Sequence, residues 1–257
     1  MPNPGRRLTA SLLAVAGLMT VTGVVATPAA AIRGGSTTTT EAAPFAVMIR
    51  NPDGVEGKDS AWCGGTLVAP DKVLTAGHCV KNAPRPLAMT VVGGRTDRLS
   101  TAGQVRRVTA VKMDPKYTTD LVHDAAVLTL DKPLPYKPLR VATTKDAALY
   151  TNGRTATVYG WGHTDGNTQG RFLKKAALTL SPLAACDPFS NTTDTSLKVC
   201  GTSAKHDSIC SADSGGPLVE SGVLIGIVST GNKVCGDEYP VSVFTKVSTV
   251  APGLGLK

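Results

Sequence analysis

Asp213-Ser214-Gly215-Gly216-Pro217 is the stretch from which the fold of this chain can be argued. Two glycines after a hydroxyl residue allow other backbone segments, or a substrate, to approach closely. A serine hydroxyl is a weak nucleophile unless a base and an orienting carboxylate stand beside it. The stretch therefore marks Ser214 as a candidate nucleophile and directs the search to histidines and acids elsewhere in the chain.

The chain has four histidines, and one of them has a favourable setting. His78 lies in residues 74–79, Leu-Thr-Ala-Gly-His-Cys, at the end of an apolar strand and beside a cysteine whose disulfide would fix its position. Asp124 leads directly into the apolar residues 125–130, where a buried carboxylate requires a hydrogen-bonding partner. His78, Asp124 and Ser214 are thus the candidate base, orienting acid and nucleophile.

The order of these three residues discriminates between hydrolase architectures. An α/β-hydrolase has its acid and histidine after the serine, whereas no histidine follows His206 here. A subtilisin-like order could use Asp53, Asp59 or Asp71 as the acid, but it requires helices and a parallel sheet that the sequence does not predict. Both alternatives are therefore disfavoured.

Short apolar segments separated by glycine, proline, asparagine and aspartate are typical of an all-β sandwich or barrel. Alternation over 241–247 has the period of a half-buried strand. A proline-rich linker near 131–150 divides the chain into two β units, 32–140 with His78 and Asp124, and 141–257 with Ser214. Strands are predicted at 45–50, 65–69, 87–92, 105–112, 125–130, 155–160, 172–180, 223–229 and 241–247.

The first 31 residues have the pattern of a secretory signal peptide. Arg6 and Arg7 precede an apolar stretch, and Ala29-Ala30-Ala31 supplies a cleavage site. A transmembrane anchor is the alternative, but the apolar stretch contains threonine, serine and glycine. Cleavage after Ala31 predicts a secreted, extracellular protein that begins at Ile32 and has no membrane partner.

Composition excludes several other classes of protein. The 257 residues, 42% of them hydrophobic, suffice for a folded core. The net charge of +8 is scattered and aromatic residues make up only 4%, so no nucleic-acid partner is expected. Six cysteines in an exported chain predict three disulfides, not a zinc or redox site, and leave their pairing open. No metal or other cofactor is expected.

At this point the chain resembles the trypsin/chymotrypsin family of serine proteases over essentially its whole mature length. The resemblance rests on 32–35 (Ile-Arg-Gly-Gly), 62–67 (Trp-Cys-Gly-Gly-Thr-Leu), 74–79 and 160–162 (Gly-Trp-Gly), together with the Ser214 stretch. It implies a secreted serine endopeptidase with two antiparallel six-stranded β-barrels and an active site in the cleft between them. It also implies three disulfides, Cys63 to Cys79, Cys186 to Cys200 and Cys210 to Cys235.

The resemblance assigns roles in acyl transfer. Ser214 attacks a peptide carbonyl, His78 takes and returns the proton, and Asp124 holds the His78 tautomer. The backbone N–H groups of Ala212 and Ser214 face the oxyanion. Ala212 stands where the family has glycine, which predicts a weakened or reshaped oxyanion hole.

The new α-amino group of Ile32 is expected to pair with Asp213. Because cleavage after Ala31 exposes Ile32 directly, we expect a protease that is active on export without a separate zymogen step. Arg33 stands where the family has an apolar residue.

The resemblance leaves two alternatives for specificity. The floor of the substrate pocket falls on Ser208, with walls formed by Ser229, Thr230, Gly231 and Ser242. This neutral pocket favours medium apolar or aromatic side chains, and Ser229 and Gly231 offer backbone groups to an extended substrate. A shift of one residue would bring Asp207 to the floor and favour arginine or lysine.

A rival interpretation comes from a different class. Ala212, Arg33 and Thr230 depart from the family pattern, so the chain could be an inactive or weak homologue that serves as a protein-binding module. An intact set of His78, Asp124 and Ser214 favours the enzyme. The expected partners are protein or peptide substrates and a proteinaceous inhibitor, and the expected state is a monomer.

Overall fold

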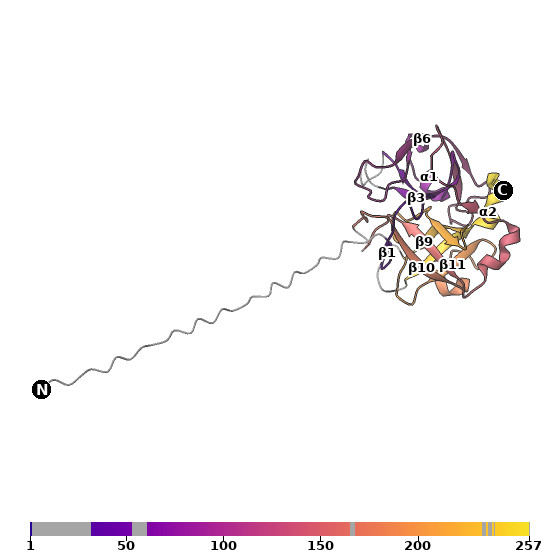
Figure 1. Cartoon of the computed structure of the whole chain (residues 1–257). Helices are drawn as coiled ribbons and strands as arrows, with labels where there is room; N and C mark the ends of the chain where they lie inside the picture. Colours follow the sequence, from indigo (N-terminus) through magenta and orange to yellow (C-terminus); the bar gives the residue numbers. More distant parts are fainter. Residues whose placement is uncertain are drawn as a thin grey trace.

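The computed structural model describes Met1 and residues 32–52, 61–164, 168–232, 235, 238 and 240–256. Apart from Met1, the predicted signal peptide lies outside these residues. In the described part the chain is mostly strands, arranged as the two barrels that Figure 1 shows next to each other. The predicted fold class, two antiparallel six-stranded β-barrels, is confirmed. No helix in the described ranges is long and apolar enough to cross a membrane.

The first barrel is closed in the strand order β2-β3-β4-β7-β6-β5. Its interior is filled by aliphatic side chains such as Val47, Leu67, Val91 and Leu128, all fully buried. Branched side chains of this kind pack well on a pleated surface, which explains why these segments form strands. The strands are β2 (Ala46–Arg50), β3 (Cys63–Ala69), β4 (Lys72–Thr75), β5 (Thr90–Gly93), β6 (Gln104–Met113) and β7 (Ala126–Leu130).

The second barrel closes because β9 pairs with both β10 and β12. In β10, buried and exposed residues alternate almost perfectly, as a strand with one face in the core requires. β1 (Ser36–Thr37) extends the sheet beside β10, and β8 (Arg140–Val141) pairs in parallel with β13. The barrel strands are β9 (Thr155–Gly160), β10 (Lys174–Ser181), β11 (Lys198–Thr202), β12 (Pro217–Glu220), β13 (Val223–Gly231) and β14 (Val241–Lys246).

Helices are short in the described part of the chain. The α-helices are α1 (Gly77–Lys81) and α2 (Val247–Leu254), and the 3₁₀ segments are η1 (Pro86–Ala88), η2 (Thr144–Tyr150) and η3 (Leu183–Cys186). α2 ends at Gly255, which has a φ of 78° and so adopts the left-handed conformation typical of a helix C-terminus. Each predicted strand segment overlaps an observed strand, but no pattern predicts β11 or β12, which have only 5 and 4 residues.

The chain passes between the barrels inside the predicted linker. Leu134 and Leu139 donate backbone hydrogen bonds to Pro70 and Leu67 of the first barrel. The next residue, Arg140, already pairs with Val223 of the second barrel. The hydrogen bonding thus changes barrel at this point, and the domain boundary at residue 140 stays a prediction.

Three disulfides are present, and no described cysteine is free. They join Cys63 to Cys79, Cys186 to Cys200 and Cys210 to Cys235, the pairing that the resemblance implies. The first links β3 to α1, and the third fixes the segment that leads to Ser214. Both therefore restrain parts of the chain that carry candidate site residues.

Candidate active site

Strand pairing in the first barrel brings His78 and Asp124 together. α1 follows β4, Asp124 lies two residues before β7, and β4 pairs with β7 so that Thr75 faces Ala126. His78 Nδ1 lies 2.8 Å from Asp124 Oδ2, and the backbone N–H of His78 donates to Asp124 Oδ1 at 2.8 Å. The acid therefore holds both the ring and the backbone of the histidine.

Asp124 is fully buried and yet is stabilised in its charged form. Burial alone would raise the pKa of this carboxyl, but hydrogen bonds from His78 and Ser229 and the charge of His78 hold its pKa below the usual value. The Ser229 hydroxyl donates to Asp124 Oδ2 at 2.7 Å. An ionised, fully hydrogen-bonded acid can orient an imidazole and stabilise its protonated form.

Ser214 belongs to the second barrel but is held against the first. Its carbonyl oxygen accepts a hydrogen bond of 2.8 Å from the N–H of Gly64 in β3. A Cβ atom at Gly64 would lie 2.9 Å from the Cα atom of Gly216, and one at Gly215 would lie 2.2 Å from Thr75 Oγ1. The glycines around Ser214 are therefore required for the two barrels to approach here.

His78 and Ser214 line one cleft of about 580 Å³. The described residues form no hydrogen bond between Ser214 Oγ and the His78 ring. In enzymes without substrate, contacts of this kind are often long and tighten when the substrate binds. The other lining residues are Lys81, Asn82, Tyr117, Thr119, Leu121, Ile209, Cys210, Ser211, Ala212, Val228, Ser229, Thr230, Gly231 and Asn232.

Ala212 has a φ of 66°, a backbone conformation in the left-handed region that favours glycine. It lies in the wall of the cleft, two residues before Ser214. Within the described part of the chain, the N–H groups of Ala212 and Ser214 have no protein acceptor, so they are available to a substrate oxygen. The residue that departs from the family's glycine thus has a positive φ, which is unfavourable for a residue with a Cβ atom.

Replacing Ala212 with glycine is expected to raise the free energy of unfolding by about 0.5–1 kcal/mol, because glycine adopts a positive φ without steric cost. Urea unfolding monitored by circular dichroism measures the change. Ala148→Gly, at an exposed position in η2, is the matched control and should lower stability. An Ala212→Gly protein that is no more stable than the natural chain would show that the site is not strained.

Asp213 is fully buried beside Ser214. Its carboxylate accepts hydrogen bonds from the N–H groups of Gly162 and Cys210 at 2.8 and 3.0 Å. Burial is the dominant effect and raises the pKa of Asp213 to about 7. A Cβ atom at Gly160 or Gly162 would lie only 2.0 or 2.4 Å from this side chain, which explains the Gly-Trp-Gly motif.

Ile32 is also fully buried and packs in the core. Its φ is 50°, and its carbonyl oxygen accepts a hydrogen bond from Gly35 at 3.2 Å. In the uncleaved chain the nitrogen of Ile32 is a peptide nitrogen, and among the described residues it makes no hydrogen bond to Asp213. Both members of the expected pair are thus buried, and no hydrogen bond joins the Ile32 nitrogen to Asp213 in the described part of the uncleaved chain.

The predicted pocket residues fall into two groups. Thr230, Gly231 and Ser229 line the cleft, whereas Ser208 and Ser242 are buried and do not. The Ser242 hydroxyl accepts a hydrogen bond from the N–H of Ile209 at 3.1 Å, and Thr230 Oγ1 donates to the carbonyl of Phe189 at 2.6 Å. The hydroxyls of Ser242 and Thr230 are therefore engaged within the protein.

Asp207 lies against the N-terminal segment. A Cβ atom at Gly34 would be 2.1 Å from Asp207 Oδ1, and Ser203 Oγ donates to Asp207 at 3.4 Å.

Ile209, which sequence reasoning did not select, lines the cleft next to Gly231 and is 5% exposed. The signal in the sequence that could have identified Ile209 is an apolar residue directly before Cys210. No described residue that lines the cleft is acidic.

The C-terminal end of β13 presents a strand edge at the cleft. β13 and β14 have a register irregularity between Val228 and Thr230, so Ser229 has no cross-strand partner. Beyond Val228 the described residues pair with β13 only on its β14 side. Such a bulge redirects a side chain and ends regular pairing, which here turns the Ser229 hydroxyl toward Asp124 and leaves backbone groups for an extended peptide.

Cys63, His78 and Cys79 are close enough to suggest a metal site by distance alone. The two cysteine sulfurs are bonded to each other, however, whereas a metal requires free thiolates. This cluster is therefore a disulfide beside a histidine.

A fold of two such barrels with a cleft between them defines the chymotrypsin-like serine endopeptidases. The family model described as Trypsin matches residues 32–253, and the chain belongs to the trypsin family and is a serine endopeptidase by that membership. It is 36% identical to a trypsin from Saccharopolyspora erythraea, over 78% of this chain and 86% of that protein.

A glucanase inhibitor protein from Phytophthora infestans is 29% identical, over 73% of this chain and 74% of the relative. The structure of mouse neuropsin, a serine protease expressed in the limbic system of the brain, superposes with a TM-score of 0.72 and 26% identity, over 84% of this chain and 95% of that one.

Proposed function

We propose that the chain hydrolyses peptide bonds through Ser214, His78 and Asp124. The observation that carries this proposal is the pair of hydrogen bonds from His78 to the buried Asp124, in a cleft that Ser214 also lines. The available N–H groups of Ala212 and Ser214 point to the same chemistry, because acyl transfer develops negative charge on the substrate oxygen.

The reaction divides into two steps. Ser214 Oγ attacks the peptide carbonyl carbon while His78 takes the hydroxyl proton, and the carbonyl oxygen becomes an oxyanion. The oxyanion collapses, the C–N bond breaks and His78 gives its proton to the leaving amine. Water then attacks the acyl-enzyme with His78 again as base, which releases the acid and restores the Ser214 hydroxyl. Asp124 stabilises the charged imidazole in both steps.

A protein-hydrolysis assay tests this proposal. The purified chain starting at Ile32 should cleave an unfolded, fluorescently labelled protein, and a fluorophosphonate should stop the cleavage. Ser214→Ala protein from the same preparation is the control for contaminating proteases. Cleavage that persists undiminished in this variant would contradict the proposal.

A second candidate function is protein binding without catalysis. The observation in its favour is the left-handed backbone at Ala212, which places an L-residue in the segment proposed to bind the oxyanion. A relative is named as a glucanase inhibitor protein, which is consistent with binding roles on this fold. A folded chain that starts at Ile32, binds a peptide in the cleft and shows no turnover would favour this candidate.

We infer secretion as the context of this activity. Disulfides form in oxidising compartments, and the three bonds observed fit an exported protease. Removal of residues 1–31 as a signal peptide, a monomeric state and inhibition by a proteinaceous inhibitor stay predictions. Analytical ultracentrifugation of the secreted chain tests the monomer.

The neutral pocket is the alternative that the geometry favours. Asp207 lies against Gly34, whereas Ile209 and Thr230 line the cleft. We expect kcat/KM to be at least about 100-fold higher for peptides with leucine or phenylalanine before the cleaved bond than for arginine or lysine, because a buried cation without a counter-charge is strongly unfavourable. A peptide library cleaved by the protein measures the ratio.

Ile209→Ala is the matched variant for this pocket, because it should widen the pocket without adding charge. It is expected to shift the preference from leucine toward phenylalanine while arginine stays a poor substrate. A natural protein that prefers arginine or lysine would show that Asp207 turns into the pocket when substrate binds, and the neutral interpretation would then be wrong.

A further inference from the structure

A buried lysine stands behind the acid of the proposed active site. Lys198, the first residue of β11, is only 2% exposed. Its ammonium group donates hydrogen bonds to the hydroxyls of Ser229 and Thr245 at 2.8 and 3.2 Å. A buried lysine is rare without a paired partner, because removal of an ammonium ion from water is costly. The nearby negative charge is that of Asp124 and Asp120.

The hydrogen bonds from Lys198 to Asp124 have a fixed direction. An ionised carboxylate only accepts, so the single proton of the Ser229 hydroxyl must point to Asp124 Oδ2. The oxygen of Ser229 is then left to accept from Lys198, which has only donors. The series of hydrogen bonds therefore runs from the ammonium group through Ser229 to Asp124. The positive charge of Lys198 polarises these hydrogen bonds toward the carboxylate.

We propose that Lys198 is a positioning residue of the active site, which acts through Ser229 on Asp124 and extends the activity of His78 as a base toward lower pH. The inference rests on the proposed function of the same site. It concerns a residue that touches neither the substrate cleft nor the reacting atoms.

The physical basis is electrostatic. The negative charge of Asp124 stabilises the protonated imidazole of His78, and a positive charge on the far side of Asp124 opposes this stabilisation. A charged Lys198 therefore favours the neutral imidazole, which is the form of His78 that accepts a proton. Burial lowers the pKa of Lys198 to about 8, although Asp124 and Asp120 oppose this shift, so the lysine is mostly charged at and below neutral pH.

Several other titratable groups lie around the hydrogen bonds from Lys198 to Asp124. Their effects on the pH profile must be separated from that of Lys198. Tyr117 packs against Gly77 of α1, close to His78, and burial raises its pKa. His123, next to Asp124 in sequence, lies 3.6 Å from Asp114. The remaining groups are Asp120 before β7, Tyr150 of η2, Asp194 before β11 and Lys246 of β14.

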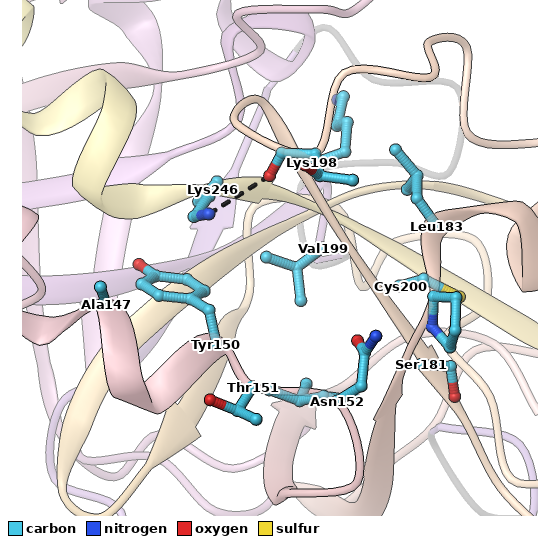
Figure 2. A pocket seen from close by; sticks show the side chains of 13 residues that line it. Ala147, Tyr150, Thr151, Asn152, Ser181, Leu183, Lys198, Val199, Cys200 and Lys246 are labelled. Carbon is cyan, nitrogen blue, oxygen red and sulfur yellow. Dashed lines mark hydrogen bonds between the residues drawn. The ribbon is translucent and has the colours of Figure 1, made fainter.

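Lys246 offers a matched control. Lys198 and Lys246 both line a second cavity, of about 450 Å³, but their side chains take different directions, as Figure 2 shows. The ammonium group of Lys246 donates to the carbonyl of Thr195 at 3.2 Å and lies 4.5 Å from the centre of the Tyr150 ring. Removal of this charge leaves the Lys198 to Asp124 hydrogen bonds intact.

The test compares Lys198→Met, which removes the charge at similar volume, with Lys246→Met. In Lys198→Met protein the acid limb of the pH profile of kcat/KM is expected to move to higher pH by about 0.5–1 unit. This is the size expected for the loss of one charge close to Asp124. Lys246→Met should leave the limb within about 0.2 unit of its natural position, because the charge of Lys246 acts on Asp194 and its ammonium group donates to Thr195.

A second measurement does not depend on turnover. NMR titration of ¹³C-labelled histidine in the inactive Ser214→Ala background follows His78 directly, with His78→Gln to assign its signal. The His78 midpoint should rise in Lys198→Met and stay in Lys246→Met. Lys198→Gln, which keeps a donor but no charge, should behave as Lys198→Met does, and it serves in its place if the methionine variant does not fold.

The outcomes separate the inference from the proposed function. An unchanged His78 midpoint in both Lys198 variants, or an equal change in Lys246→Met, would overturn the role of Lys198. A raised midpoint in a protein whose natural form shows no hydrolysis would instead support the role of Lys198 and contradict the proposed function.

Discussion

Replacement of Ser214 with alanine is expected to lower kcat by about 10⁶-fold, and addition of His78→Ala to this variant is expected to cost almost nothing more. The reason is that nucleophile and base act as one unit, so a base without a nucleophile has no proton to take. Asp124→Asn should cost about 10⁴-fold, because the amide favours the wrong histidine tautomer. Steady-state hydrolysis of a peptide ester measures all of these variants.

Ser196→Ala is the control, since this exposed serine lies before β11 and takes no part in the proposed chemistry. It should retain the natural rate. If losses in Ser214→Ala and His78→Ala were small and simply added together, the two residues would not act as a unit. The binding-module interpretation would then gain support.

Retention of Ala31 before Ile32 is expected to lower kcat/KM by about 100-fold or more, because a buried carboxylate that loses its ammonium partner costs about 3–5 kcal/mol. Asp213 is fully buried next to Ser214, so rearrangement around an unpaired carboxylate would disturb the N–H groups of the cleft. The comparison uses two proteins, one that starts at Ala31 and one that starts at Ile32, with Ile32→Val as a control that preserves the α-amino group.

The same pair of proteins should differ in the pH dependence of stability. In the uncleaved chain, burial raises the pKa of Asp213 to about 7, well above its ordinary value of 3.8. The unfolded state therefore loses this proton at lower pH than the folded state, and stability falls as pH rises between these values. A partner ammonium group in the Ile32 form should remove most of this fall. Urea unfolding at about pH 5 and about pH 8 measures it, and identical profiles for both proteins would contradict the pairing.

The sequence indicates which residues form the candidate site more clearly than it indicates what surrounds them. His78, Asp124 and Ser214 each stand in a distinctive local context, and the pairing of β4 with β7 then places the first two in contact. Lys198 could not be found in this way, because a lysine at the start of a short strand has the pattern of a surface residue. Only the closed barrel shows that it points to the interior.

Specificity depends on distinctions finer than sequence spacing provides. Ser208 and Asp207 are neighbours, and successive side chains in extended backbone point in opposite directions, so an error of one residue changes the predicted pocket floor from neutral to negative. The structure separates them by the contact of Asp207 with Gly34. Ala212 shows the converse case, because the departure from glycine is visible in the sequence and its cost becomes evident only from a φ of 66°.

The central claim is that Ser214 is an activated nucleophile in a correctly matured chain. Intact-mass spectrometry of the secreted protein, before and after reaction with a fluorophosphonate, tests it most directly. The account predicts a start at Ile32, the mass of a chain with all six cysteines oxidised, and one adduct that maps to Ser214 and is absent from Ser214→Ala. A chain that starts at Ile32 with its disulfides formed, and that takes up no adduct, would contradict it.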